Sequence, residues 1–218
     1  MAIAVDTDYR VITEGCGVVD RSQRGKLALT GSEAKSFLQG QVTNDVEGLE
    51  PGRGCYAAFL THKGKMLGDM RVLDVGDELL LDTERVALQE LFNMIRRYRL
   101  GRDVELHKRT LELGLLSLIG PEARRVASAE DLVAEHANRR GEVAGVPVVL
   151  VATDVGVDIF TPAERVPEVR AALDAVPVSE EAAEVLRLES GRPRFGVDIV
   201  AGVIPQEAGL YERAVSFT

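Results

Sequence analysis

Three carboxylates stand where a side chain could bind a ligand or move a proton: Glu189, Asp82 and Asp69. Glu189 falls in the last turn of a helix predicted over "SEEAAEVLRLESGRP", which Ser179 begins and a Gly-x-Pro sequence ends. The carbonyl groups at a helix C-terminus make a carboxylate unfavourable there by about 0.3 to 1 kcal/mol. Glu189 is therefore either paired with a nearby arginine or solvated, or it accepts paired N–H donors from a ligand.

Asp82 and Asp69 both lie on predicted strands. Asp82 ends one strand and precedes a helix, so it either caps that helix or presents its carboxylate at the rim of a pocket. Asp69 follows the glycine turn of "KGKMLGDM", on the returning strand. It is either a solvated strand residue, a partner of Arg71 or Lys65, or a group that takes part in proton transfer.

A basic segment, "RRYRLGRDVELHKR" over 96–109, stands out in a chain of net charge -9 and pI about 5.0. Its arginines either form the solvated C-terminal end of a helix or anchor the anionic tail of a ligand. The acidic balance of the whole chain argues against a surface that follows nucleic-acid phosphates. We therefore expect no nucleic-acid partner.

Other classes of site find little support in the sequence. The three histidines and two cysteines show no metal-ligand spacing and no CxxC, so neither a zinc site nor a disulfide framework is expected. No P-loop, GxGxxG or nucleophile elbow occurs. No apolar run approaches the roughly 18 residues of a membrane span and the N-terminus has no signal-peptide pattern, so we expect a cytoplasmic protein without a membrane partner.

The elements that must position these residues occur twice. "GKLALTGSEAKSFL" over 25–38 and "GLLSLIGPEARRVA" over 114–127 each read as a strand that ends at glycine and leads into a helix. A second similarity relates "LLLDTERV" over 79–86 to "DIFTPAERV" over 158–166. Two halves of similar plan, 1–110 and 111–218, are the simplest account, with chance similarity as the alternative.

The remaining pattern predicts antiparallel sheets with helices packed on them. "GCYAAFLTHKGKMLGDMRVLDVGDELLLD" alternates strand-like runs with glycine turns, which indicates two or three antiparallel strands. "ERVALQELFNMIRRYRLG" then places Leu88, Leu91, Phe92 and Ile95 on one face of a helix. The predicted class is α+β, in which the two sheets could interleave.

Four segments together resemble the folate-binding superfamily that contains the glycine-cleavage T-protein, an aminomethyltransferase, and the YgfZ-type proteins. They are "GKLALTGSEAKSFLQGQVTNDVEGLEPGRGCYAAFLTHKGKMLGDMRV", "LGLLSLIGPEA", "RLESGRPRFGVDI" and "IPQEAGL". They occur in order along nearly the whole chain, and "FLQGQVTNDV" and "KGKM" are closer to the YgfZ branch.

The resemblance implies a pseudo-duplicated α+β fold that binds tetrahydrofolate or another folate. It places Glu189 in the Leu-Glu-x-Gly motif whose glutamate holds the pterin ring. It also places Asp82, with its neighbour Leu81, at a strand end that lies along the pterin. Arg99 in the basic segment is a candidate for the folate tail on grounds of charge alone.

The chain departs from the family pattern at two places. The transferases have two successive aspartates after the turn, the first of them catalytic, whereas this chain has Gly68 and then Asp69. Neighbouring strand residues point to opposite faces, so Asp69 is not expected to replace the missing carboxylate. Gly68 and Asp69 remain candidates for contact with folate. The chain also stops at Thr218, before the Cys-containing motif and C-terminal barrel of YgfZ-type proteins, so we expect the barrel to be absent.

These observations predict a folate-binding protein of the YgfZ type, whose relatives support iron–sulfur cluster assembly or repair. No catalytic residue and no metal ligand is assigned. The chain holds no cluster ligand set, so any iron–sulfur role is expected to be indirect, with iron–sulfur assembly proteins as candidate partners. One alternative is aminomethyl transfer in the glycine cleavage system, against which Gly68 counts. Another is a scaffold that no longer binds folate.

Overall fold

The computed structural model describes residues 2–217, with side chains from Val5 onward. The chain divides into two compact units, a first unit of Met1–Gln23 and Leu111–Arg192 and a second unit of Arg24–Thr110 and Pro193–Thr218. One division point lies between Thr110 and Leu111. The two ends of the chain, however, each belong with the half that is remote in sequence, so the units are not consecutive halves.

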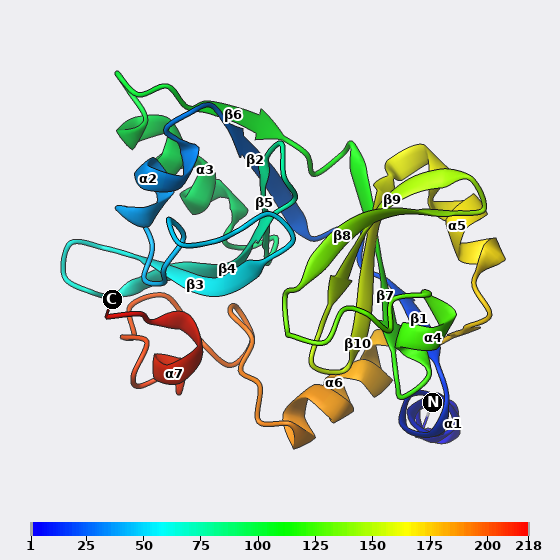
Figure 1. Ribbon diagram of the computed structural model, residues 1–218. Helices are drawn as coiled ribbons and strands as arrows, with labels where there is room; N and C mark the ends of the chain where they lie inside the picture. The colour runs from blue at the N-terminus through cyan, green and yellow to red at the C-terminus, as the bar shows by residue number, and fades with distance from the viewer. Residues whose placement is uncertain (1, 218) are drawn as a thin grey trace. The chain divides into compact units, whose positions relative to one another are not determined.

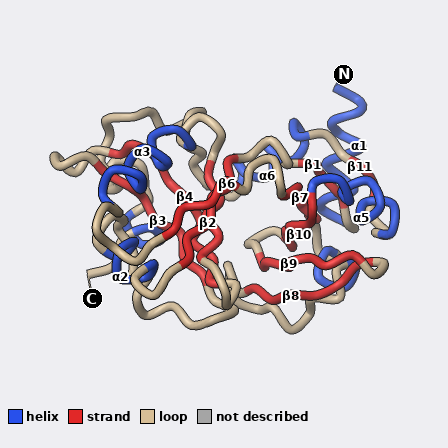
Figure 2. Tube along the Cα trace, turned by 90° about the horizontal axis from the view of Figure 1, so that it is seen from above, coloured by secondary structure: helices blue, strands red, loops and turns tan. Residues whose placement is uncertain are grey.

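The first unit contains a six-stranded sheet (Figure 1). Its elements are α1 (Ala2–Glu14), β1 (Gly17–Asp20), β7 (Leu113–Ile119), α4 (Ala123–Val126), β8 (Asn138–Val143), β9 (Val146–Ala152), β10 (Gly156–Pro162), the 3-10 helix η1 (Ala163–Arg165), α5 (Val166–Ala172), β11 (Val176–Pro177) and α6 (Glu180–Glu189). The strand order is β11-β1-β7-β10-β9-β8, and only the β1–β11 pair is parallel. Figure 2 shows β8 and β9 side by side.

The second unit contains a five-stranded antiparallel sheet. Its elements are β2 (Gly25–Thr30), α2 (Ala34–Gln39), β3 (Gly54–Leu60), β4 (Met66–Asp74), β5 (Leu79–Thr83), α3 (Leu88–Tyr98), β6 (Glu105–Lys108) and α7 (Tyr211–Ala214). The strand order is β3-β4-β5-β2-β6. The α+β class predicted from the sequence is confirmed.

The two sheets have the same strand order in four of their strands, and they exchange the strand next to these. The series β3-β4-β5-β2 of the second unit corresponds to β8-β9-β10-β7 of the first. The next strand in each sheet is the one that precedes the other series along the chain, because β1, which precedes β2, pairs with β7, and β6, which precedes β7, pairs with β2. The internal repeat seen in the sequence therefore corresponds to two sheets that exchange one strand each, β1 and β6.

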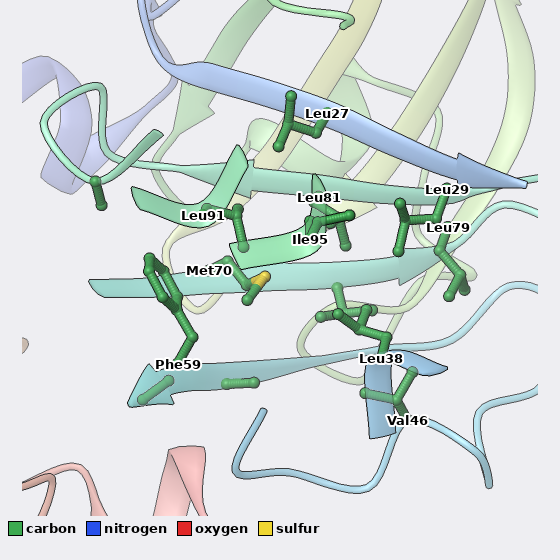
Figure 3. Packing of buried hydrophobic residues seen from close by; sticks show 14 of the residues in the cluster. Leu27, Leu29, Leu38, Val46, Phe59, Met70, Leu79, Leu81, Leu91 and Ile95 are labelled. Carbon is green, nitrogen blue, oxygen red and sulfur yellow. The ribbon is translucent and has the colours of Figure 1, made fainter. Parts of the chain in front are cut away.

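Helices cover the sheet faces according to strand alternation. In the first unit Val18 joins a cluster with α4 and α5, whereas the adjacent Val19 joins a cluster with α1 and α6 on the other face. In the second unit one sheet face packs against α2 and α3 (Figure 3). The predicted apolar face of α3 is confirmed there, since Leu91 and Ile95 are buried and Leu88 and Phe92 are partly buried.

No helix among residues 2–217 is long and apolar enough to cross a membrane. Each unit contains one of the two cysteines as a thiol, and burial raises the pKa of Cys16 to about 11 and that of Cys55 to about 12. Both thiols are therefore protonated at neutral pH.

Candidate functional site

The sheet of the second unit has a polar face opposite its hydrophobic core. Strand pairing sets Tyr56 opposite Arg71, Arg71 opposite Asp82, and Ala58 opposite Asp69. Because alternate residues share a face, these four polar side chains lie on one side of the sheet. Met70 and Val72 of the same strand belong to the core on the other side.

Asp82 is the anchor of this polar face. Its side chain is fully buried and accepts hydrogen bonds from Arg24 Nε at 2.9 Å and from Arg71 Nε at 2.8 Å. Burial alone would raise the pKa of this carboxyl, but the two guanidinium groups hold it well below its usual value. Asp82 is thus charged at neutral pH, and it does not cap α3, whose N-cap residue is Ala87.

The network continues from Asp82 to a second carboxylate. Arg24 also donates to Glu84, and Arg194 Nη2 lies 3.1 Å from the other Glu84 oxygen. These side chains are between 14% and 24% exposed, so the charges are partly shielded from solvent. Arg194 lies in the part of the chain after Pro193 that belongs to the second unit, and this contact joins it to the residue that follows β5.

Asp69 has a different environment from Asp82. It is 5% exposed, and Tyr56 Oη donates to its Oδ2 at 2.5 Å. Burial raises the pKa of Asp69 to about 6, and burial together with the Asp69 charge raises the pKa of Tyr56. The interpretation of Asp69 as a solvated residue or an ion-pair partner of Arg71 or Lys65 is wrong, because a neutral phenol is its direct hydrogen-bond donor.

Gly68 faces the core, on the side opposite Asp69. A Cβ atom at this position would lie 2.4 Å from the Phe59 ring and 2.7 Å from Ala87 Cβ. Phe59 is completely buried and pairs with Gly68 across the adjacent strands (Figure 3). The glycine is therefore required by the packing of Phe59, and an aspartate would fit only if that ring moved.

Two further predicted residues are engaged elsewhere in the second unit. The Leu81 side chain is fully buried in the core, on the face opposite Asp82. Arg99 follows α3, and its Nη1 donates to the carbonyl of Val104 at 2.8 Å. This contact joins the end of α3 to the chain that leads into β6.

Glu189 ends α6 in the first unit. Glu189 is exposed, and Tyr9 Oη of α1 donates a hydrogen bond to Glu189 Oε2 at 2.5 Å. The arginines nearest to it in sequence are paired with other carboxylates, Arg187 with Glu184 and Arg192 with Asp154. An ion pair with these arginines therefore does not explain Glu189.

Two exposed apolar side chains lie near Glu189, Val185 on the same helix face and Leu188 beside Val185. Val185 is 38% exposed and Leu188 is 60% exposed. Positions separated by three or four residues lie side by side on a helix, so Val185 neighbours both Leu188 and Glu189. The end of α6 thus presents a carboxylate beside open apolar surface, a combination that suits a flat ring with polar groups along one edge.

The segment after Glu189 is fixed by its own bonds. Gly191 has a φ of +62°, which is the left-handed conformation that commonly ends a helix. Arg192 Nε binds Asp154 at 3.0 Å, and its Nη1 lies 3.4 Å from Glu135 Oε1. The turn that follows the Leu-Glu-x-Gly motif is therefore attached to two loops of the same unit.

The family model described as the GCVT N-terminal domain matches residues 1–218. The chain belongs to this family. Among curated proteins, this GCVT N-terminal domain is 29% identical over 220 residues to the aminomethyltransferase of Chloroherpeton thalassium, covering 93% of the chain and 61% of that protein. It is 28% identical over 220 residues to the aminomethyltransferase of Thermotoga petrophila, covering 93% of the chain and 60% of that protein.

Solved structures agree on the fold of this GCVT N-terminal domain. Glycine cleavage system aminomethyltransferase T from Bartonella henselae matches with a TM-score of 0.85 at 21% identity, over 94% of this chain and 59% of that one. A chain of heterotetrameric sarcosine oxidase from Corynebacterium sp. U-96 matches with a TM-score of 0.56 at 18% identity, over 84% of this chain and 93% of that one. The domain spans about 60% of the length of the curated relatives it matches.

Sequence reasoning missed the partners of the predicted carboxylates. Tyr56 and Arg24 were not singled out in the second unit, nor Tyr9 in the first. Arg194 was considered as a partner of Glu189, but it binds Glu84. Strand alternation around Asp69 could have suggested Tyr56 once the β3–β4 register was known. No signal in the sequence relates Tyr9 to Glu189, because the two are 180 residues apart.

The "VTND" motif of this GCVT N-terminal domain joins the C-terminal helix to the sheet. Thr43 Oγ1 accepts the Ala58 N–H at 2.9 Å and donates to the Ala214 carbonyl. Asn44 Nδ2 donates to the carbonyls of Tyr56 at 2.8 Å and Arg213 at 3.1 Å. The motif therefore has a structural role beside Tyr56, since it fixes α7 against β3.

Proposed function

We propose that this GCVT N-terminal domain binds tetrahydrofolate through Glu189 and supports iron–sulfur cluster assembly or repair in the manner of YgfZ-type proteins. The observation that carries the folate proposal is the end of α6, where the exposed carboxylate of Glu189 lies beside exposed Val185 and Leu188. The YgfZ assignment is supported by the "FLQGQVTNDV" and "KGKM" segments.

The chemistry of the pterin suits this surface. A pterin presents an amino group and a ring N–H side by side, and two such donors match the two oxygens of one carboxylate. Its flat ring would cover the apolar side chains next to Glu189. When bound, tetrahydrofolate supplies nitrogen atoms that carry one-carbon groups.

The proposal assigns no chemical step to this chain. Asp82 is occupied by two arginines, and Gly68 provides no carboxylate. Among the described residues, no group of three or more His, Cys, Asp or Glu side chains could hold a metal ion. The proposed role in iron–sulfur metabolism is therefore indirect, through folate and a protein partner. Contact of Asp69, Leu81 and Arg99 with folate stays a prediction.

Calorimetric titration with tetrahydrofolate tests the proposal. Charge-assisted hydrogen bonds contribute roughly 1.5 to 3 kcal/mol each, so Glu189→Gln should weaken binding by about tenfold or more. Glu181→Gln is a matched control, because this exposed glutamate lies in the first turn of the same helix and should leave affinity unchanged. No binding by the wild-type chain, or equal binding by Glu189→Gln, would overturn the assignment.

Aminomethyl transfer to tetrahydrofolate is the second candidate, favoured by the names of the curated relatives. Gly68 counts against it, since the position expected to hold the catalytic aspartate has no side chain and no room for one. An assay of glycine cleavage with the lipoyl carrier protein separates the two candidates. Turnover well above background would overturn the non-catalytic proposal.

A further inference from the structure

Tyr9 of α1 contacts Glu189, the residue proposed to bind folate. The Tyr9 hydroxyl donates to Glu189 Oε2 at 2.5 Å, within the range of an O–H bond to a charged oxygen. The hydrogen bond to Glu189 raises the pKa of Tyr9, so the phenol remains a donor across the physiological pH range. Both residues belong to the first unit.

The position of Tyr9 is fixed by the packing of α1 against α6. Ile12 of α1 is buried with Ala182 and Ala183 of α6, and Tyr9 packs partly buried against this cluster. At the other end of α6, the Asp8 carboxylate accepts the Ser179 N–H at 2.9 Å. Two adjacent residues of α1, Asp8 and Tyr9, thus contact the two ends of α6. The packing of α1 on α6 therefore fixes the position of the Tyr9 ring.

We infer that Tyr9 is a positioning residue for Glu189, whose carboxylate it holds in one orientation toward a ligand with paired N–H donors. The inference rests on the proposed function, since it concerns the same carboxylate. It extends the binding site from α6 to α1, a part of the chain to which neither the family motifs nor the comparisons assign a role.

The contact and a bidentate ligand are compatible. A carboxylate has about four lone-pair positions, and a paired donor edge uses one on each oxygen. Tyr9 occupies one position on Oε2, so Oε1 and the second position of Oε2 are left for the ligand. An exposed glutamate without such a donor samples many rotamers, and fixing it in advance removes part of the entropy cost of binding.

Calorimetry with tetrahydrofolate on four variants tests the inference. Tyr9→Phe keeps the ring and removes the hydroxyl, and it should weaken binding by about fivefold. In a Glu189→Gln background, the same change should have little further effect, because the group that Tyr9 orients has lost its charge. Asp8→Ala is the control, since it removes the hydrogen bond between α1 and the N-terminal end of α6 without touching Glu189. It should leave the affinity unchanged even where it lowers the melting temperature.

A spectroscopic measurement on the free protein tests the contact without ligand. The Tyr9 phenol, identified by comparison with Tyr9→Phe, should titrate at lower pH in Glu189→Gln than in the wild type. If the wild type binds tetrahydrofolate and Tyr9→Phe binds it equally well, the role of Tyr9 is overturned while the proposed function stands. The same holds if Asp8→Ala weakens binding as much as Tyr9→Phe does. Absence of wild-type binding would overturn the proposed function and this inference together.

Discussion

Two aspartates on one sheet face of the second unit have pKa values that are shifted in opposite directions. Asp82 is surrounded by the guanidinium groups of Arg24 and Arg71, whose attraction outweighs the cost of burial and lowers its pKa. Asp69 receives its direct hydrogen bond from the neutral phenol of Tyr56, so the cost of burial prevails and its pKa rises to about 6. The kind of donor, cation or phenol, decides which carboxylate can exchange a proton near neutral pH.

The raised pKa of Asp69 predicts a pH-dependent stability. The folded chain holds the Asp69 proton up to about pH 6, whereas the unfolded chain releases it near 3.8. This contribution is therefore complete below pH 3.8 and is lost as the pH rises to 6 and above. Relative to Asp69→Asn, which stays neutral, the wild type should lose roughly 2 kcal/mol of unfolding free energy between pH 4 and 7.

Urea unfolding of both proteins at several pH values measures this difference. The comparison cancels the other carboxylates, among them Asp82, whose lowered pKa gives the opposite dependence at lower pH. A difference between wild type and Asp69→Asn that stays constant from pH 4 to 7 would contradict the prediction.

Single residues of the candidate site could be predicted only where local sequence sets their environment. The place of Glu189 at the end of a helix followed from "SEEAAEVLRLESGRP", and the structure has that helix at Glu180–Glu189. The burial of Asp69 could not be predicted, because it depends on tertiary packing around β4. The contact from Tyr9 depends on how α1 docks on α6, for which a single sequence contains no local signal.

At the scale of elements, the repeated strand-to-helix joint was predictable because glycine has a special role in it. Gly31 and Gly120 end the corresponding strands with φ values of +105° and +126°. In each case a Cβ would lie within 2.3 Å of a backbone oxygen, that of Asp103 or Gly15. The exchange of β1 and β6 between the sheets was not predictable, since the pairing of these strands depends on contacts remote in sequence.

Gly120→Ala should destabilise the first unit through this joint. The substitution combines a strained backbone with a contact against the Gly15 carbonyl that can be relieved only by moving the chain, and we expect a cost of about 2 to 4 kcal/mol. Gly64→Ala is the control, because Gly64 has a φ of +73° but no atom within 4 Å of the added Cβ, and it should cost about 1 kcal/mol. Chemical denaturation measures both, and equal losses would show that the close approach has no effect.

At the scale of the whole molecule, each hydrophobic core combines segments that are far apart in the sequence. The core of the second unit includes Phe195, Ile199, Leu210 and Ala214 from the C-terminal segment, although its sheet is complete by residue 108. The first unit needs α1 and β1 from the N-terminus, which supply Ile12 and Val19. A cut between residues 110 and 111 would therefore leave both cores incomplete.

This arrangement predicts the outcome of a fragment experiment. A chain of residues 1–110 lacks Phe195, Ile199 and Leu210, and each large buried side chain contributes roughly 1.5 to 3 kcal/mol. The total loss of about 5 kcal/mol or more approaches the whole stability of a small domain. A fusion of residues 24–110 to 193–218 through a flexible linker restores these side chains. It should unfold at a higher urea concentration than the fragment 1–110, whereas equal midpoints would mean that the C-terminal segment adds nothing to this core.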